Sequence, residues 1–187
     1  MAGTRALIVI DVQNEYFDGV LPITSPPRES SLANIGKAMD AATAAGVPVI
    51  VVRHVETDPD APIFRAGTPA IELHDAVASR SGDHDVEKHM PGSFTGTPLG
   101  DILDAAGVDT LSVTGYMTHM CVDTTARQAV HRGMTVEILD DATGTLALDN
   151  AGGKVSGEEL HRAILAAQAH GLSEVISTDE WLGRIGG

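Results

Sequence analysis

Ala6-Leu-Ile-Val-Ile-Asp11 is the stretch of this sequence that decides the fold. Its first five residues are all apolar, which is typical of a parallel strand that is buried on both faces of a sheet. Asp11 then ends the run with a charge. Because ligands of open α/β sheets bind beyond the carboxyl ends of the strands, this position is the first candidate for function.

Short apolar runs alternate along the chain with longer segments of helical period, as expected of a parallel sheet with crossover helices on both faces. The predicted strands cover residues 6–10, 47–52, 86–88, 110–114, 135–139 and 174–177. The predicted helices cover residues 28–45, 99–106, 120–132 and 156–169. The sequence therefore predicts a three-layer α/β/α fold of the Rossmann-like class, with a six-stranded, mainly parallel sheet. It is expected to form a single domain over residues 1–187.

Two connecting segments show little periodicity. Residues 56–83 hold much of the proline, and they are expected to form an ordered excursion over the surface. Residues 140–156 are rich in Asp, Gly and Thr, and they are expected to form a loop. Ser156 and Glu159 have the spacing of a capping box, which predicts the start of the last helix.

Composition limits the classes of partner. The chain has 187 residues, with 12 Lys and Arg against 26 Asp and Glu and a formal net charge of -14. This charge repels nucleic-acid phosphates and anionic lipids, so the expected partner is a small-molecule substrate, with no nucleic acid and no membrane. No apolar run approaches the roughly 20 residues that a bilayer span needs, and no secretion signal pattern is present, so a cytoplasmic location is expected.

Cys121 is the single cysteine of the chain. It cannot form an internal disulfide or a thiolate metal cage, so any function it has is that of a lone thiol. It falls near the first turn of a predicted helix, where unpaired N–H groups and the helix dipole favour a thiolate. Taken alone, an inert buried cysteine is the more common interpretation.

Asp11, Lys88 and Cys121 each follow a different predicted strand. Asp11 could instead cap a turn with Asn14, and Lys88 alone could be a surface charge. Because the carboxyl ends of parallel strands meet at one edge of a sheet, the three side chains are expected to converge. A nucleophilic cysteine needs one group that moves protons and one that holds the thiolate, and a carboxylate and a cation supply both.

Three segments carry a resemblance to a known family. They are residues 6–17 (ALIVIDVQNEYF), Lys88 with residues 93–97 (SFTGT), and residues 114–126 (TGYMTHMCVDTTA). The last segment is the most specific, because it combines a strand, a glycine and a threonine three residues ahead of Cys-Val. With these segments the chain resembles the isochorismatase-like cysteine hydrolases, which include nicotinamidases and other amide hydrolases.

The resemblance implies a catalytic triad of Asp11, Lys88 and Cys121. It also implies a cis peptide bond between Met117 and Thr118, and an oxyanion hole formed by the backbone N–H groups of Met117 and Cys121. Burial raises the pKa of such an aspartate and a neighbouring lysine lowers it, and the sequence does not decide which effect is larger. By the same resemblance, the protein is expected to form a homodimer or a larger homo-oligomer.

Candidate walls of the substrate pocket come from the segments around the triad. Gln13, Phe17 and Phe94 resemble residues that line the family's pocket. Tyr116 and His119 are added because their segment flanks the nucleophile in sequence. A small, partly aromatic pocket without strong positive charge favours a neutral or cationic amide over a polyanion. Arg53 also lies at the end of a predicted strand and could reach a carboxylate, so a substrate with one acidic group stays an alternative.

No metal or other cofactor is expected. Nicotinamidases bind a divalent metal through an Asp-x-His pair after the second strand and a further histidine, but here Val52 stands two residues before His54. His54, Glu56 and His74 offer nitrogen and oxygen ligands, so a site made from them stays an alternative. The resemblance then implies a metal-independent cysteine hydrolase that cleaves a C–N bond of a small molecule through a thioester.

Three other functions stay open. They are an isochorismatase-type hydrolase of another metabolite, a non-catalytic assembly protein that keeps the fold, and a nucleotide-binding or oxidoreductase domain. The last is disfavoured, because the first strand leads into Asp11-Val-Gln-Asn14 and not into the Gly-x-Gly-x-x-Gly turn that admits a pyrophosphate.

Overall fold

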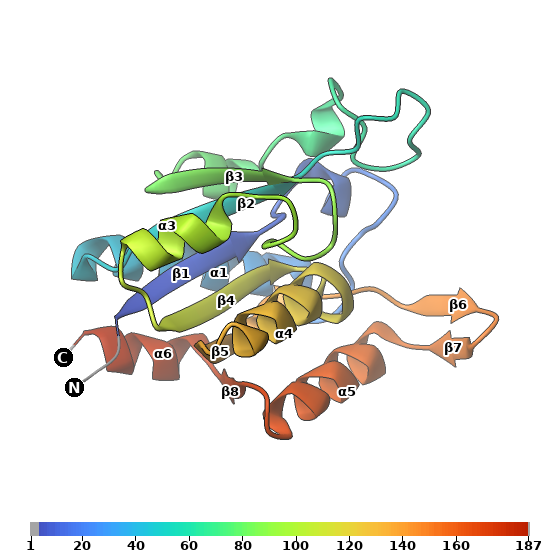
Figure 1. The fold of residues 1–187 in the computed structure, drawn as a ribbon. Coiled ribbons are helices and arrows are strands. Elements are labelled where there is room, and N and C mark those ends of the chain that lie inside the picture. The colour runs from blue at the N-terminus through green and yellow to red at the C-terminus, as the bar shows by residue number, and fades with distance from the viewer. Residues whose placement is uncertain (1–3, 187) are drawn as a thin grey trace.

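The computed structural model describes residues 4–186, and its centre is a sheet of six strands that all run parallel (Figure 1). The order of the strands across the sheet is β3-β2-β1-β4-β5-β8. Their bounds are β1 Arg5–Ile10, β2 Val49–His54, β3 His84–Lys88, β4 Thr110–Tyr116, β5 Thr135–Gly144 and β8 Glu174–Ile176. The predicted six-stranded α/β fold is confirmed.

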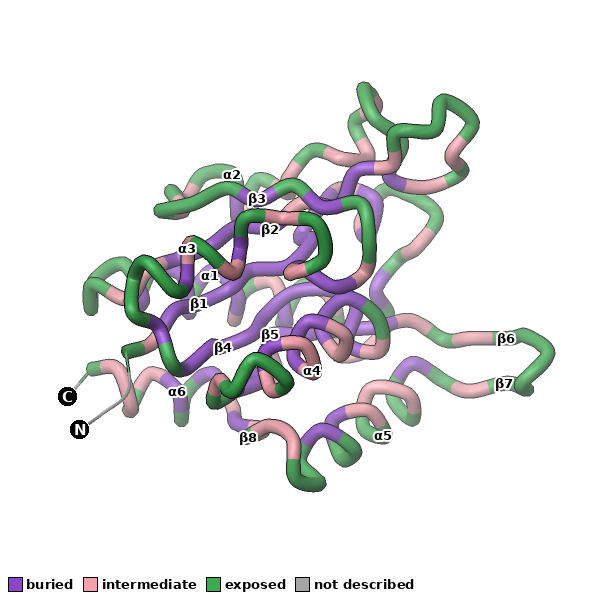
Figure 2. The backbone as a smooth tube through the Cα atoms, in the orientation of Figure 1, coloured by how far each residue is buried: buried purple, intermediate pink, exposed green. Residues whose placement is uncertain are grey.

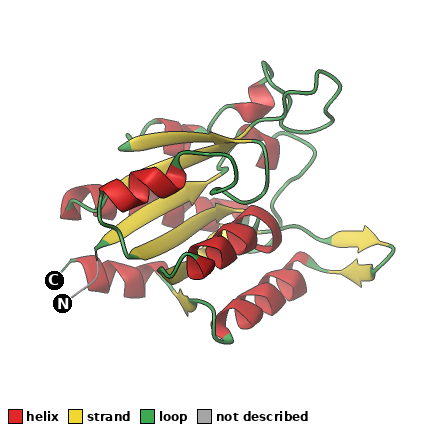
Figure 3. Cartoon of the chain, viewed as in Figure 1, coloured by secondary structure: helices red, strands yellow, loops and turns green. Residues whose placement is uncertain are grey.

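Helices cover both faces of the sheet (Figures 1 and 3). The first face carries α1 (Arg28–Ala45), the short α2 (Asp75–Ala78) and α6 (Thr178–Ile185), whose apolar side chains share one core cluster. The second face carries α3 (Leu99–Ala105), α4 (Asp123–His131) and α5 (Gly157–Ala169), which share another. The three layers predicted from the sequence are therefore present.

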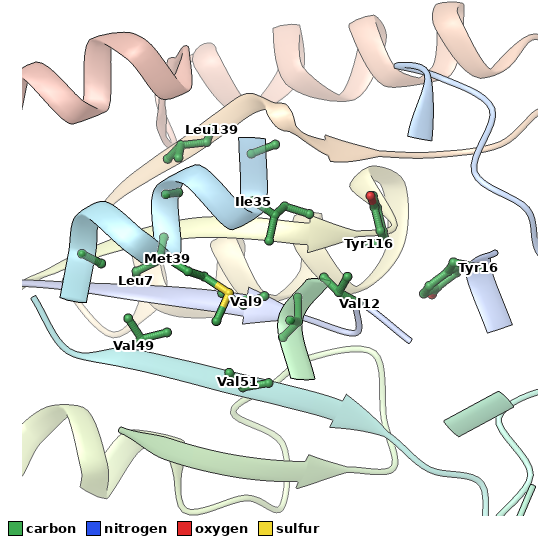
Figure 4. Packing of buried hydrophobic residues seen from close by; sticks show 14 of the residues in the cluster. Leu7, Val9, Val12, Tyr16, Ile35, Met39, Val49, Val51, Tyr116 and Leu139 are labelled. Atoms are coloured by element: carbon green, nitrogen blue, oxygen red, sulfur yellow. The ribbon is translucent and has the colours of Figure 1, made fainter. Parts of the chain in front are cut away.

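β1 joins the two core clusters because its side chains alternate between the faces of the sheet. Leu7 and Val9 point toward α1, where they pack near Met39 (Figure 4). Ile8 and Ile10 point to the other face. Every residue from 6 to 10 is fully buried, and Figure 2 shows the central strands as the most buried part of the chain. This burial fixes the strand whose end carries Asp11.

The expected loop at residues 140–156 is wrong in part. β5 continues to Gly144, and an antiparallel hairpin of β6 (Leu148–Asn150) and β7 (Gly153–Val155) follows. Residues 140–144 resemble a loop by composition, but β5 continues through them, and Thr143 and Gly144 pair with β4 beyond an irregularity in register. Long-range pairing therefore outweighs local propensity here. The predicted capping box of Ser156 and Glu159 is present at the start of α5.

The helix predicted at residues 120–132 begins differently. A π-helical turn, η3 (Thr118–Val122), precedes α4 and carries the cysteine. Two further helices, α2 and α6, had no predicted counterpart, and the excursion at residues 56–83 contains α2 and the 3₁₀ turn η2 (Pro69–Ile71). A second 3₁₀ turn, η1 (Asn14–Tyr16), follows β1. Within residues 4–186, no helix has both the length and the apolar content that a bilayer crossing requires.

Candidate active site

Asp11 lies directly beyond the carboxyl end of β1 and is fully buried. Its backbone has a positive φ of 52°, a conformation that Asp adopts more readily than most other residues. Its N–H donates to the carbonyl of Val52 at 2.9 Å, and its own carbonyl accepts from the N–H of Gln13 at 2.8 Å. The turn therefore fixes the carboxylate inside the edge of the sheet.

Lys88 is the last residue of β3, and its side chain has no exposed surface. Its Nζ lies 2.8 Å from Asp11 Oδ2 and 3.3 Å from Cys121 Sγ. It also lies 3.0 Å from Nδ1 of His54. An ammonium carries three N–H donors, so Lys88 has one acceptor for each of them.

Cys121 lies in η3, directly beyond β4, and only 7% of it is exposed. The structure thus brings together the three side chains that the sequence placed at the ends of separate strands, with Lys88 in contact with both of the others. A thiol, a carboxylate and an ammonium in contact can perform nucleophilic attack with local proton transfer.

The electrostatics of Asp11 and Cys121 follow from their burial. Desolvation raises the pKa of Asp11 above its ordinary value, and this effect outweighs the opposing charge of Lys88. Burial, with the Asp11 carboxylate as the second cause, raises the pKa of the Cys121 thiol well above its usual range. Apart from its contact with Lys88, Asp11 has no hydrogen-bond partner for either carboxylate oxygen among residues 4–186. The carboxylate is therefore available to accept a proton.

The predicted cis bond between Met117 and Thr118 is wrong by one residue, because the cis bond lies between Tyr116 and Met117. The physical reason is that β4 keeps its pairing with β5 through Tyr116, so the chain changes direction immediately after that residue. Among residues 4–186, the N–H of Met117 donates to no backbone oxygen in a turn, loop or cap. The N–H of Cys121 belongs to the first turn of η3, where N–H groups lack intrahelical partners.

Gln13 and Tyr116, two of the expected pocket walls, are fully buried in the scaffold. The amide of Gln13 exchanges two hydrogen bonds of 2.8 Å with the backbone of His54 and donates to the carbonyl of Ile71 at 2.9 Å. The hydroxyl of Tyr116 lies 2.9 Å from that of Ser31, and burial raises the pKa of Tyr116 to about 12. Both side chains therefore connect elements of the fold.

The other three expected walls are partly exposed. Phe17 packs against the ring of His74, with their centroids 4.2 Å apart. Phe94 lies under the guanidinium of Arg132, which is 5.1 Å from its ring centroid, and packs against the core cluster that contains the cysteine. The ring of His119 lies 2.6 Å from a threonine hydroxyl, and burial lowers its pKa. Contact of these residues with a substrate stays a prediction.

The residues around His54 do not fit the divalent metal of nicotinamidases. Val52, at the position of the aspartate ligand, is apolar and fully buried. Both ring nitrogens of His54 are engaged, Nδ1 by the Lys88 ammonium at 3.0 Å and Nε2 by the Glu56 carboxylate at 2.8 Å. His74 accepts a backbone hydrogen bond on Nδ1, and residues 4–186 hold no cluster of three or more potential ligands.

The contact between His54 and Lys88 was not predicted from the sequence, where His54 was considered only as a possible metal ligand. A signal was nevertheless present, because parallel pairing of the second and third strands sets His54 opposite Lys88. A shift of two residues in the predicted end of the second strand concealed it. β2 ends at His54 and not at Val52.

Known proteins share the domain and the fold of this chain. Residues 5–180 match the family model of the isochorismatase domain. Nicotinamidase 3 of Arabidopsis thaliana is 30% identical over 187 aligned residues, which cover 94% of this chain and 85% of that protein.

Two solved structures share the fold. A protein of Burkholderia xenovorans LB400, provisionally named an isochorismatase, has a TM-score of 0.98 and 50% identity, covering 100% of this chain and 89% of that one. A cysteine hydrolase of Pseudomonas syringae pv. phaseolicola 1448A has a TM-score of 0.89 and 31% identity, covering 98% and 92%. From its matched domain, its fold and these relatives, the chain belongs to the isochorismatase family of hydrolases.

Proposed function

We propose that this protein is a metal-independent cysteine hydrolase that cleaves a C–N bond of amide type in a small molecule. The observation that carries the proposal is the position of the buried Lys88 ammonium, 2.8 Å from the Asp11 carboxylate and 3.3 Å from the Cys121 sulfur. The similarity to a nicotinamidase supports an amide as the substrate class, and the similarity to a cysteine hydrolase supports the nucleophile.

In the first half-reaction, the Cys121 sulfur attacks the amide carbon while its proton passes to Asp11. The carbonyl oxygen becomes an oxyanion, which the backbone N–H groups of Met117 and Cys121 stabilise. The intermediate then collapses, the C–N bond breaks, and the proton on Asp11 passes to the leaving nitrogen. The products at this stage are a free amine or ammonia and a thioester on Cys121.

In the second half-reaction, water attacks the thioester carbon while Asp11 takes one of its protons. The C–S bond breaks, the carboxylic acid leaves, and the sulfur recovers its proton from Asp11. Lys88 stabilises the sulfur whenever it carries negative charge. The raised pKa of Asp11 suits this role, because a more basic carboxylate takes a thiol proton at a smaller free-energy cost.

The substrate is proposed to be a neutral or cationic carboxamide. Phe17, Phe94 and His119 are its proposed walls. The buried ring of Tyr116 packs edge-on against Phe17, with their centroids 6.0 Å apart, and the buried Gln13 holds the backbone of His54. The proposed location is the cytoplasm, where a lone thiol such as Cys121 stays reduced.

Replacement of the nucleophile tests the proposal. We expect Cys121→Ala to lower the turnover of a responsive carboxamide by at least about 10³-fold, because no other group can form the thioester. Turnover is measured as ammonia release from a panel of carboxamides of graded charge, and mass spectrometry of quenched wild-type enzyme should detect an acyl adduct on Cys121. Cys121→Ser keeps the size of the side chain and serves as the matched control for packing.

The alternatives predict different outcomes. If Cys121→Ala kept more than a few per cent of the activity on any substrate, covalent catalysis would be wrong. An isochorismatase-type hydrolase of another metabolite would release no ammonia from any carboxamide of the panel. A non-catalytic assembly protein would have a Cys121 thiol that reacts with iodoacetamide no faster than an unassisted buried thiol.

A further inference from the structure

The Lys88 ammonium has a third neighbour that the proposed mechanism does not use. Lys88 is fully buried, and among residues 4–186 the polar partners of its Nζ are Asp11 Oδ2 at 2.8 Å, Cys121 Sγ at 3.3 Å and Nδ1 of His54 at 3.0 Å. Each N–H of a buried ammonium needs an acceptor, because water cannot replace a missing one. His54 therefore completes the coordination of Lys88.

The contacts of His54 define its tautomer. Nδ1 faces an ammonium donor, so this nitrogen carries a lone pair and accepts. Nε2 lies 2.8 Å from Glu56 Oε1, so it carries the hydrogen and donates to the carboxylate. A proton on both nitrogens would set two cations against each other in the interior. The Glu56 carboxylate thus orients the ring with its lone pair toward Lys88.

The imidazole of His54 is also held in place mechanically. Its side chain is 10% exposed, whereas that of Glu56 is 39% exposed. Gln13 exchanges two hydrogen bonds with the His54 backbone, and the ring of Phe64 packs edge-on with its centroid 5.1 Å away. These contacts keep Nδ1 of His54 at a fixed position, so it does not move with the Lys88 side chain.

We propose that His54, oriented by Glu56, is a positioning residue that keeps the Lys88 ammonium aimed at the thiol while negative charge moves between Asp11 and Cys121. This inference rests on the proposed function. Asp11 is the anion at rest, and it loses that charge when it takes the thiol proton. In the thioester the sulfur carries no charge. Of the three partners of Lys88, His54 alone is an acceptor of unchanging charge throughout the cycle.

The titratable groups that contact the His54 ring among residues 4–186 are Lys88 from β3 and Glu56 beyond the end of its own strand. Behind Lys88 lie Asp11, from the end of β1, and the Cys121 thiol, from η3. Without the His54 acceptor, the ammonium would be drawn toward Asp11 and away from the sulfur. The thiol would then lose stabilisation of its anionic form.

Alkylation of Cys121 by iodoacetamide, followed across pH, tests this inference without knowledge of the substrate. We expect His54→Leu to slow alkylation at pH 7 about tenfold and to move the pH profile upward by about one unit, because a lost hydrogen bond to a charged group has an effect of about that size. His54→Asn places an amide oxygen near the position of Nδ1, so it should stay within about threefold of wild type.

Glu56→Gln tests the second contact. It removes the charge that orients the ring, and about a threefold slowing is expected. Glu87→Gln is the matched control, because Glu87 is an exposed carboxylate next to Lys88 in sequence, and it should behave as wild type. On a responsive carboxamide, His54→Leu should lower kcat and leave KM nearly unchanged.

The outcomes separate this inference from the proposed function. The positioning role would be wrong if the folded His54→Leu variant were alkylated at Cys121 as fast as the wild type. It would also be wrong if His54→Asn slowed the alkylation as much as His54→Leu does. In both cases the hydrolase proposal would stand. If His54→Leu did not fold, the Glu56→Gln variant would decide the question. Equal rates of Cys121 alkylation in Glu56→Gln and Glu87→Gln would overturn the positioning role. The hydrolase proposal itself would be wrong if iodoacetamide did not alkylate Cys121 in the wild type and if the Cys121→Ala variant still turned over a carboxamide.

Discussion

Asp11 and Lys88 are a buried ion pair in which each charge depends on the other. Both side chains are fully buried and their charged atoms lie 2.8 Å apart. Lys88→Met should destabilise the protein by about 3–5 kcal/mol, because it leaves the carboxylate without a partner. Asp11→Asn combined with Lys88→Met should recover at least half of that loss, as measured by urea unfolding at pH 7. No recovery would mean that the loss comes from packing and not from the unpaired charge.

The pH dependence of Lys88→Met follows from the raised pKa of Asp11. A carboxyl whose pKa is raised on folding destabilises the folded state fully above its folded pKa. This penalty begins to shrink as pH falls through the folded pKa and is gone below the lower, unfolded pKa. The destabilisation of Lys88→Met should therefore shrink as the pH is lowered from 7, whereas the double variant should show no such change. This direction could not be predicted from the sequence, since the depth of burial of Asp11 decides it.

At the scale of elements, the approach of β4 to β1 depends on Gly115. This residue has a φ of 106°, and a Cβ there would lie 2.0 Å from the carbonyl oxygen of Ile10. Gly115→Ala should destabilise the protein by at least about 2 kcal/mol, through positive-φ strain and overpacking. It should also abolish turnover, because the displaced end of β4 carries η3 and the cysteine with it.

Gly183→Ala is the matched control for this prediction. Gly183 lies in α6, and no atom lies within 4 Å of the Cβ that the substitution adds. In a helix interior the change should stabilise by up to about 1 kcal/mol and leave activity unchanged. Thermal unfolding and turnover of both variants check the pair. A Gly115→Ala protein of wild-type stability would contradict the close approach described for the two strands.

The elements that could be predicted from the sequence are those whose pattern is local. β1 was evident because its five apolar residues are flanked by polar ones, and α5 because its capping box is a local contact. The continuation of β5 through residues 140–144 could not be predicted, since only pairing with β4 makes a polar segment extended. The contact of His54 with Lys88 could not be predicted for the same reason. It requires that β2 extend to His54, and the periodicity of the sequence does not define where that strand ends.

At the scale of the whole molecule, Glu137 connects the first strand to the last helix. Its carboxylate accepts from Arg5, Ser112 and Arg184, and its side chain is only 2% exposed. Burial acts to raise the pKa of Glu137, but these hydrogen bonds outweigh it and lower the pKa. Such a carboxylate stabilises the fold above its unfolded pKa, and that stabilisation is lost as pH falls through the folded pKa.

Glu137→Gln should therefore lower the free energy of unfolding by about 1.5–3 kcal/mol at pH 7, the usual value for hydrogen bonds to a charged group. The variant and the wild type should become equally stable as the pH is lowered below the ordinary pKa range of Glu. Urea unfolding at a series of pH values measures it, with the exposed Glu180→Gln as control. A difference that stayed constant with pH would show that the charge of Glu137 is not responsible.

Assembly is a second property of the whole molecule. The family resemblance predicts a homodimer or a larger homo-oligomer. A groove of about 450 Å³ runs along α5, lined by residues that include Leu165, Ala166 and Ala169. Light scattering at micromolar concentration should give at least twice the monomer mass of 19.4 kDa. A clean monomer would exclude a pocket that a second subunit completes.

The order of the strands has a consequence for synthesis of the protein. Residues 5–10 of β1 pair on one side with residues 110–115 of β4, so the centre of the sheet closes a loop of about a hundred residues. Until β4 leaves the ribosome, the most apolar strand has one edge bare, which is the state most open to aggregation. Asp11 and Cys121 meet only after that edge is closed. The contact of Cys121 with its buried neighbours can therefore form only after translation has passed β4 and the open edge of β1 has been closed.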